Sequence, residues 1–419
     1  MTRSLSPLSL LCLCWALAGI VTVLTLAHLD DLDMVQTFIA REGISTDVFG
    51  LTGLAWVAIG FLAYLVGDLA ARVTRPTPTA PGPRPDLARA ARLTFLANLL
   101  LLAVTGLWIA TSAAKLGGLM QLVAAAYVDS LTTRDLMLEN KLFTGMRLFY
   151  AALPATASLA AGLLATGQLR GRTRWLMLAT LGINTAALMV LPIVMSQRLL
   201  LLQLMLSAYL MACLVRGRVF GLYWIGVVVT LFFGLWAARE AITNPTLDRS
   251  ALDIAWQKLA FYVVNDMFNG FAPLTRPIPH TLGGTTLEGV MFLTFTDGYF
   301  LTLLAPRLDA LDPVIGGGEF PIFTAAFVDY GPIGGALFLA LMGFVLRRIF
   351  ARARISLTWA AIYAQIGAAM LFSAHSVYFL HQNFYFSAAL LAVVLHLSTR
   401  RRSEPNKGFF ATLPKVTHA

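Results

Sequence analysis

Apolar stretches of about 20 residues recur along this chain, and that is the length of a membrane-spanning helix. Ten stretches qualify, each bounded by charged residues or by Pro and Gly. Their ranges are 8–28, 48–67, 93–114, 146–168, 175–196, 199–215, 219–238, 321–346, 357–375 and 384–398. Only 12% of the residues are charged, against roughly 25% in soluble domains, which excludes a soluble enzyme. We expect an all-α polytopic membrane protein with about ten transmembrane helices, residues 1–419 forming a single integral membrane domain.

The charges of the predicted loops give the chain an orientation. With both termini on one side of the membrane, that side holds 20 of the 31 Lys and Arg residues and 3 of the 21 acidic residues. Cytoplasmic loops of membrane proteins carry the excess of Lys and Arg, so we expect both termini to be cytoplasmic. The formal net charge of +10 then reflects orientation, and no nucleic-acid partner is expected.

Two long segments between the predicted spans are polar. Residues 72–92 are rich in Pro and predict a flexible cytoplasmic loop, whereas 239–320 predict one large external loop between the seventh and eighth spans. Within the latter, 252–271 predict an amphipathic helix on the membrane surface or over a cavity. Its predicted apolar face comprises Leu252, Ala255, Leu259, Tyr262, Val263 and Phe268. Residues 290–305, interrupted by Asp297 and Gly298, favour a re-entrant or interfacial segment.

The motifs of soluble enzymes are missing from the sequence. It contains no P-loop, no dinucleotide-binding fingerprint, no G-x-S-x-G and no H-E-x-x-H. No predicted cytoplasmic segment is long enough for a nucleotide-binding domain, so an enzyme of this kind takes an activated substrate from the membrane. We expect no cofactor and no metal, because the three cysteines lie in apolar runs and the histidines of the last external turn have no adjacent carboxylate.

The first candidate site residues lie on predicted external segments. Arg198 stands between two apolar runs, where a guanidinium either binds phosphate through a bidentate fork or anchors to lipid headgroups. Arg239 and Glu240 follow the seventh span and form a local ion pair or a second anion contact. Arg276 and His280 lie on a Pro-stiffened loop, where His is either an acid–base group or an ordinary surface residue.

The other candidates flank the last spans. Glu319 precedes the eighth span, and Asp329 lies within it, where an ionisable group is costly and is by default functional or paired. His375 and His381 lie in the last external turn and either contact substrate or cap the interface. An acceptor hydroxyl needs a base, and the candidates for catalytic groups are Glu240, His280, Glu319, Asp329 and His375. We expect Arg276, His280 and Glu319 to converge with Arg198 and Arg239 on one outward-facing, membrane-level cavity lined by the predicted helix 252–271.

Three features resemble bacterial oligosaccharide repeat-unit polymerases of the O-antigen, Wzy type: the segment S-Q-R-L-L-L-L-Q-L-M-L-S-A-Y-L, the long external loop after it, and F-P-I-F-T-A-A-F-V-D-Y-G-P-I-G-G. The resemblance covers roughly residues 190–350 and the overall span count. Arg198 matches the external Arg of the family, and Asp329-Tyr330-Gly331 matches its Asp-aromatic-Gly motif. Arg239, Arg276, His280 and His375 match by region only. The chain is also similar, more distantly, to O-antigen ligases, although their His pairing does not align cleanly.

The resemblance implies a glycosyltransferase of the bacterial inner membrane that polymerises undecaprenyl-diphosphate-linked oligosaccharides on the periplasmic face during O-antigen or exopolysaccharide synthesis. The substrate-binding candidates are Arg198, Arg239, Arg276 and, from its place in the last external turn, His381. The resemblance makes flippase and chain-length regulator proteins candidate partners beside the lipid bilayer. The alternatives are an O-antigen ligase, a transporter or flippase of lipid-linked sugars, another membrane enzyme such as an acyltransferase, and a structural assembly component. Few charges lie mid-span, which disfavours a transport pathway.

Overall fold

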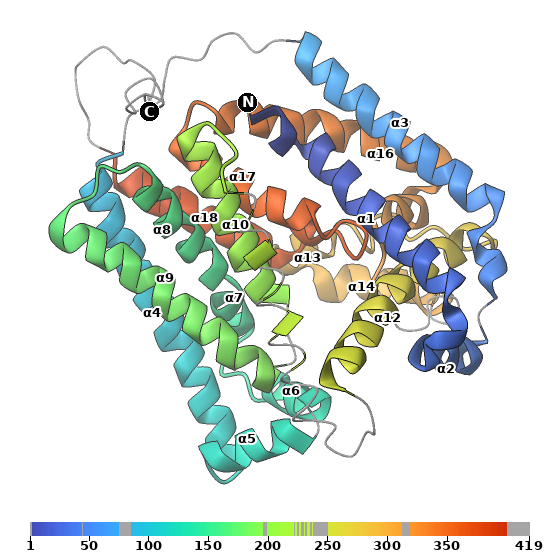
Figure 1. Ribbon diagram of the computed structural model, residues 1–419, viewed down its shortest axis with the longest axis horizontal. Coiled ribbons are helices and arrows are strands. Elements are labelled where there is room, and N and C mark those ends of the chain that lie inside the picture. Colours follow the sequence, from blue (N-terminus) through green and yellow to red (C-terminus); the bar gives the residue numbers. More distant parts are fainter. Residues whose placement is uncertain are drawn as a thin grey trace.

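The computed structural model describes residues 2–43, 45–74, 85–128, 130–195, 199–221, 250–311 and 319–399, with a few single positions between 223 and 237. In this part of the chain the secondary structure is helical, and its one extended pairing is an isolated bridge between Pro85 and Thr399. Figure 1 shows the helices gathered into a bundle. The prediction of an all-α protein is therefore confirmed.

Seven helical segments among the described residues are long and apolar enough to cross a membrane. They are α1 (Pro7–Ala27), α3 (Leu51–Val73), α4 (Leu87–Lys115), α7 followed by α8 (Met146–Ala151 and Leu153–Ala165), α9 (Gly171–Met195), α10 (Leu199–Arg216) and α16 (Ile322–Ala353). The apolar helices α17 (Leu357–Met370) and α18 (Gln382–Leu397) are shorter. These helices define a membrane protein. The predicted span 219–238 lies mostly outside the described residues, so the count of ten stays a prediction.

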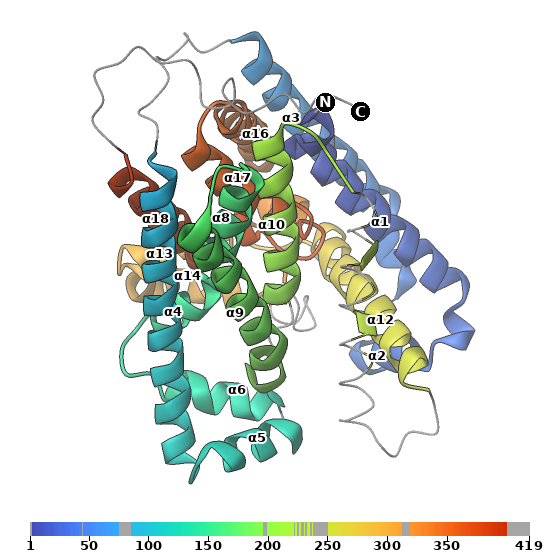
Figure 2. The same cartoon turned by 60° about the vertical axis from the view of Figure 1, so that its left-hand side comes forward.

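The segments expected to be cytoplasmic lie together. Figures 1 and 2 show the start of α1, the end of α3, the start of α4 and the end of α18 at one end of the bundle. The helices α5 (Leu119–Val128) and α6 (Ser130–Glu139) lie at the opposite end. Hydrogen bonds connect the segments at the end where α1 and α4 begin. The Asp86 N–H, just before α4, donates to the Ser398 carbonyl, just after α18, at 2.9 Å. The Tyr363 hydroxyl of α17 donates to the Leu5 carbonyl, just before α1, at 2.6 Å. The compartment that this end faces stays a prediction from charge.

Helices α3 and α16 pack closely because glycines line their contact. Gly60 and Gly67, seven residues apart on α3, both face α16. A Cβ atom on Gly67 would overlap the carbonyl of Ala340, and one on Gly343 would overlap the carbonyl of Tyr64. Small residues of this kind let two membrane helices bring their backbones together. This contact holds α16, and with it the candidate residue Asp329, in a fixed position.

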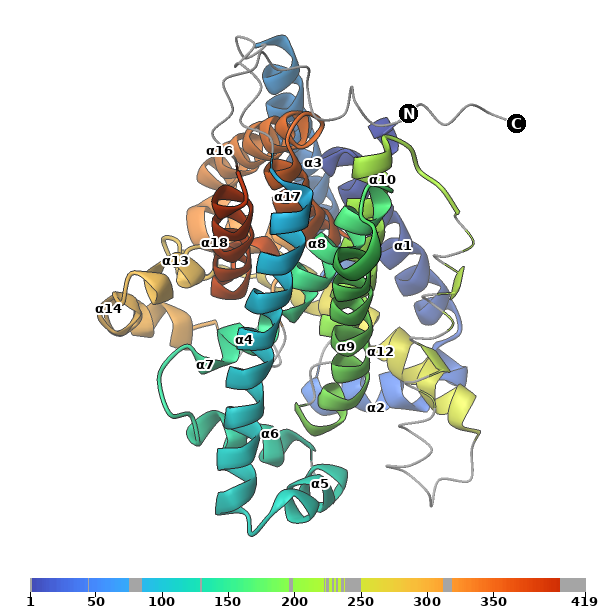
Figure 3. The ribbon, with the colours of Figure 1, turned by 90° about the vertical axis from the view of Figure 1, so that its left-hand side faces the viewer.

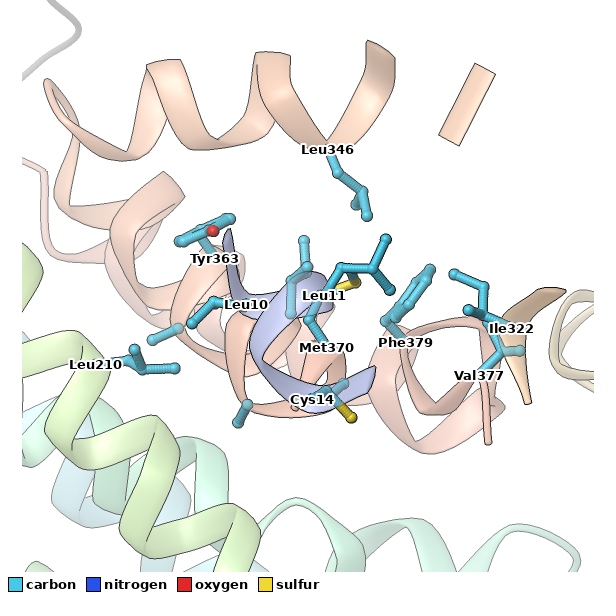
Figure 4. Packing of buried hydrophobic residues seen from close by; sticks show 14 of the residues in the cluster. Leu10, Leu11, Cys14, Leu210, Ile322, Leu346, Tyr363, Met370, Val377 and Phe379 are labelled. Atoms are coloured by element: carbon cyan, nitrogen blue, oxygen red, sulfur yellow. The ribbon is translucent and has the colours of Figure 1, made fainter. Parts of the chain in front are cut away.

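The hydrophobic core reaches from the N-terminal helix to the turn between α17 and α18. Figure 4 shows Leu11 of α1 near Met370 of α17, with Val377 and Phe379 of the turn next to Ile322 at the start of α16. Val377 and Phe379 are 5% and 2% exposed. Burying side chains of this size is favourable by about 1.5–3 kcal/mol each, so the turn is anchored to the core.

Two predicted spans have different limits in the structure. The stretch 146–168 is two helices, α7 and α8, because Pro154 lies in the first turn of α8 and cannot donate a backbone hydrogen bond into a preceding turn. The stretch 357–375 is helical only to Met370. The residues after it form turns, and the Ser373 carbonyl accepts a hydrogen bond at 3.0 Å from the Ile322 N–H instead of continuing the helix.

The segments expected to be external contain several helices. They are α2 (Asp33–Glu42), α5, α6, α12 (Ala251–Phe271), α13 (Glu288–Leu293) and α14 (Asp297–Asp309). Helix α12 confirms the predicted helix over 252–271, but its buried face differs, since Leu252 and Tyr262 are exposed whereas Ile254 and Val264 are buried. The reason is that α12 packs against both α1 and α2. Figure 3 shows α13 and α14, which contain most of 290–305, at the edge of the molecule.

Candidate functional site

The turn between α17 and α18 brings polar side chains to the level at which α16 begins. Its apolar residues Val377 and Phe379 enter the core, as Figure 4 shows, and they alternate with Ser376 and Tyr378. His375 precedes this alternation, and the turn continues to His381, which caps α18 with extended backbone. The buried apolar residues of the turn therefore fix its backbone, and the polar side chains between them can contact one another.

An aspartate of α12 pairs with the first histidine of the turn. Asp266 Oδ1 lies 2.7 Å from His375 Nδ1, and Asp266 is 8% exposed. Burial alone lowers the pKa of His375, but the hydrogen bond and the charge of Asp266, together with Glu319, raise it above its ordinary value of 6.5. Burial raises the pKa of Asp266, and its hydrogen bond to His375 opposes that shift. The pair forms a partly buried acid–base dyad.

A second group links the approach to α16 with the end of the same turn. The Ser376 hydroxyl donates to Glu319 Oε2 at 2.9 Å and lies 3.3 Å from His381 Nε2. The same Glu319 oxygen is 4.0 Å from His381 Nε2. Burial lowers the pKa of His381, the charge of Glu319 opposes this shift, and Arg147 and His375 add to it. We refer to Asp266, Glu319, His375, Ser376 and His381 as the acid–histidine cluster.

Tyr378 and Arg147 complete the surroundings of the cluster. The Tyr378 ring lies between the two imidazoles, with ring-centre distances of 5.7 Å to His375 and 5.2 Å to His381. Burial raises the pKa of Tyr378, the carboxylates of Glu319 and Asp266 raise it further, and Arg147 opposes them. Arg147, at the start of α7, therefore supplies a cation within electrostatic range of the turn. Carboxylates, imidazoles and a guanidinium meet here.

A neighbouring arrangement is built around Asp329. Its carboxylate accepts hydrogen bonds from the Thr281 hydroxyl, from the Thr285 N–H at 3.1 Å, and from the N–H and hydroxyl of Thr286 at 2.7 and 2.6 Å. Asp329 is fully buried. A carboxylate with four donors from one segment fixes the shape of that segment. Its predicted catalytic role stays a prediction, and the contact that the structure establishes is with the loop 281–286.

The helix breaks where this loop touches it. Gly331 has a φ of 69° and a ψ of −175° within α16, and a Cβ there would lie 2.8 Å from His280 Nε2. Glycine is required for both reasons. The loop then leads into α13, where a Cβ on Gly289 would overlap the carbonyl of Leu380. The Asp329 arrangement is thus joined through one short loop to the turn that carries His381.

The structure gathers some of the predicted site residues and separates others. Glu319, His375 and His381 come together in the cluster, whereas His280 lies beside Gly331 and Asp329, and Arg276 is exposed. Arg198, Arg239 and Glu240 lie outside the described residues, so the expected convergence of the arginines stays a prediction.

Sequence reasoning did not identify Asp266, Arg147, Ser376 or Tyr378 as site residues. One signal was available for Asp266, because it lies next to Met267 on the buried side of α12, where an unpaired charge is costly. Arg147 was also visible as an ionisable residue at the start of an apolar run. Ser376 and Tyr378 carry no such signal, since both residue types are common in turns.

Within the described ranges, no group of three or more His, Cys, Asp or Glu side chains is arranged to hold a metal ion. The cluster instead offers proton donors and acceptors around a half-exposed carboxylate, with a permanent cation nearby. Such a site can take up a proton and stabilise an anion. No protein-family model, no curated protein and no solved structure matches this chain.

Proposed function

We propose that this chain is a glycosyltransferase of the bacterial inner membrane that polymerises undecaprenyl-diphosphate-linked oligosaccharide repeat units on the periplasmic face. The observation that carries the proposal is the acid–histidine cluster, in which Asp266 lies 2.7 Å from His375 and Ser376 lies 2.9 Å from Glu319, beside Arg147 and within a bundle of apolar helices. The resemblance of Arg198 and of Asp329-Tyr330-Gly331 to repeat-unit polymerases adds to it.

The proposed reaction needs two kinds of group, and both are supplied by residues of this chain. An acceptor hydroxyl has to lose a proton as it attacks the anomeric carbon, and a carboxylate or an imidazole accepts it. The lipid diphosphate leaves with the electron pair of the broken bond, and cations in a low-dielectric setting stabilise that charge. Arg147 is such a cation in the described part of the chain, and Arg198 and Arg239 are proposed to act with it.

The product formed by a deletion strain tests this function. Gel analysis of lipopolysaccharide or exopolysaccharide should show single repeat units in the deletion strain and a ladder of polymers after complementation with the wild-type chain. Complementation with Glu319→Gln should fail, whereas His28→Gln should restore the ladder because His28 is exposed on the turn after α1 and belongs to no predicted site. Loss of all attached material would identify a ligase, and an unchanged ladder would exclude both activities.

Arg198 offers a separate test of diphosphate binding. Arg198→Lys should impair polymer synthesis, because an ammonium group cannot reproduce the bidentate fork of a guanidinium. Arg172→Lys is the matched control, since Arg172 is exposed at the start of α9 and belongs to no predicted site. Full polymer synthesis by Arg198→Ala at normal expression would reduce Arg198 to an anchor for lipid headgroups.

A further inference from the structure

The hydroxyl of Ser376 lies between a carboxylate and an imidazole, and only one arrangement of protons makes a hydrogen bond to each of them. It lies 2.9 Å from Glu319 Oε2 and 3.3 Å from His381 Nε2. A serine hydroxyl has one proton and two lone pairs, and an ionised carboxylate only accepts hydrogen bonds. The Ser376 proton is therefore committed to Glu319. The remaining hydrogen bond then has to be donated by His381 Nε2–H to Ser376 Oγ.

A second contact favours the same position for the imidazole proton. Glu319 Oε2 lies 4.0 Å from His381 Nε2, so the negative charge faces this nitrogen and attracts a proton on it. His375 has the opposite arrangement, because its Nδ1 lies 2.7 Å from Asp266 Oδ1 and carries the proton of that hydrogen bond. The two histidines on either side of Tyr378 therefore present different nitrogens for proton transfer.

We infer that Ser376 is a positioning residue that commits His381 to the Nε2–H tautomer and leaves His381 Nδ1 as a proton-accepting nitrogen. The burial that lowers the pKa of His381 supports this assignment, because a neutral imidazole is the form that can accept a proton. The groups that face His381 are Arg147 of α7, Glu319 ahead of α16, and His375 and Tyr378 of the same turn.

The catalytic consequence rests on the proposed function. In that reaction, the proton of the acceptor hydroxyl moves to His381 Nδ1 while the hydroxyl oxygen bonds to the anomeric carbon. The bond from that carbon to the phosphate oxygen breaks, and its electron pair leaves with the lipid diphosphate. The imidazolium so formed keeps its Nε2–H on Ser376, and the charge of Glu319 stabilises it. The proton then passes to solvent and restores the neutral ring.

The tautomer is measured without any substrate. NMR of the full-length chain in lipid nanodiscs, with isotope-labelled histidine, separates protonated from unprotonated imidazole nitrogens, and His381→Gln identifies the signals of His381. The wild-type chain should show Nε2–H and a bare Nδ1 at neutral to mildly alkaline pH. Ser376→Ala should shift the tautomer ratio toward Nδ1–H by several-fold, and Ser376→Thr should retain the wild-type ratio because it keeps the hydroxyl.

Two further variants guard against misfolding as an explanation. Glu319→Gln should also weaken the tautomer preference, because an amide can donate to Ser376 and frees the hydroxyl proton. Glu319 is half-exposed, so this substitution should leave the fold intact. Ser373→Ala removes a buried hydroxyl of the same turn that bonds to neither Glu319 nor His381, so it should leave the ratio unchanged. An Nδ1–H signal in the wild-type chain, or a ratio unaffected by Ser376→Ala and Glu319→Gln, would overturn the inference.

Polymer synthesis provides the second measurement. Ser376→Ala should lower the rate by roughly tenfold or more and change the pH profile, whereas Ser376→Thr should restore both. If the tautomers behave as expected but the wild-type chain forms no polymer, the proposed function fails and the role of Ser376 stands. If polymer forms and Ser376→Ala leaves its rate and pH profile unchanged, the positioning role fails and the proposed function stands.

Discussion

The carboxylates near the two ends of α16 differ in their partners and in their exposure to solvent. Toward the end expected to be cytoplasmic, Asp68 of α3 is fully buried, 2.5 Å from Arg72 and 3.9 Å from Arg347. Ahead of the other end, Asp266 and Glu319 lie beside histidines and are partly accessible. Arginine keeps its proton at all ordinary pH values, whereas histidine exchanges its proton near neutrality. The first end therefore has fixed charges, and the second has charges that can move protons.

The packing around the two groups differs in the same sense. Asp68 directly follows Gly67, where α3 and α16 are so close that no Cβ fits. The acid–histidine cluster instead lies mainly on a turn and on the segment before α16, with side chains that reach water. A buried charge with permanent partners serves to hold two helices in register. A partly exposed charge with titratable partners is suited to chemistry. Four measurements test this contrast.

The largest expected effect concerns the side of the membrane that each end of α16 faces. Reporter fusions at Pro81 and Thr281 should show an all-or-none difference, with Pro81 in the cytoplasm and Thr281 outside, because Lys and Arg are concentrated in the segments near Pro81. Enzymatic reporters active in only one compartment measure this. The reverse result would place the acid–histidine cluster in the cytoplasm and remove the basis for a periplasmic reaction.

The next effect is on the rate of polymer synthesis. Asp266→Asn and His375→Gln should each reduce the rate by about 100-fold, since the dyad is expected to act as a second proton-transfer group beside His381, and proton transfer by a positioned group contributes roughly 10²–10⁴. Combining them should cost little more than either alone, because the two side chains act as one unit at 2.7 Å. Losses that multiply in the double variant would show that the two residues act independently.

The arginine-paired end should respond in stability. Replacing both Arg72 and Arg347 by Ala leaves Asp68 buried without a cation, which should lower the free energy of unfolding by about 3–5 kcal/mol. Arg352→Ala is the control, because it removes an arginine from the same end of α16 that contacts the Trp359 ring and forms no ion pair with Asp68. Denaturant titration in detergent micelles, followed by tryptophan fluorescence, measures the change. Equal losses in the two variants would indicate a general effect of removing arginine there.

The smallest effect is the pH dependence of stability at the histidine end. The pKa of His375 is raised in the folded chain, so its pairing with Asp266 stabilises the protein fully below its ordinary pKa of 6.5 and loses this contribution as the pH rises through the raised value. The difference in unfolding free energy between wild type and His375→Gln should be about 1 kcal/mol or less and should shrink toward alkaline pH. A difference that grows with pH would contradict the raised pKa.

The sequence predicted much of the helical framework because hydrophobic runs of membrane length are unambiguous. The run from 8 to 28 corresponds to α1, Pro7–Ala27, and the amphipathic stretch from 252 corresponds to α12, Ala251–Phe271. Helix limits were less predictable where polar contacts decide them. Helix α4 starts at Leu87 because the Asp86 side chain accepts hydrogen bonds from the backbone N–H groups of Ala88 and Arg89.

The site was predicted only where an ionisable residue stood next to a predicted span. Glu319, ahead of the eighth span, and His375 and His381, in the last external turn, were recognised on that ground, and the structure brings them together. Asp266, the partner of His375, lies more than 100 positions before the turn that it contacts, and a pairing over that distance depends on how α12 packs against its neighbours. A single sequence carries no information about such packing.

The hydrogen bonds of Asp329 have a consequence for how sequences of this type can diverge. The carboxylate depends on hydroxyl groups at Thr281 and Thr286, and the adjacent Gly331 admits no side chain beside His280. A substitution at Asp329, Thr281 or Thr286 leaves a buried donor or acceptor without its partner, and a side chain at Gly331 would overlap His280. We expect the residues to be inherited as one unit. A two-part signature, His-Thr with two further Thr, then Asp-aromatic-Gly, should therefore identify distant relatives even when the membrane helices have lost all resemblance.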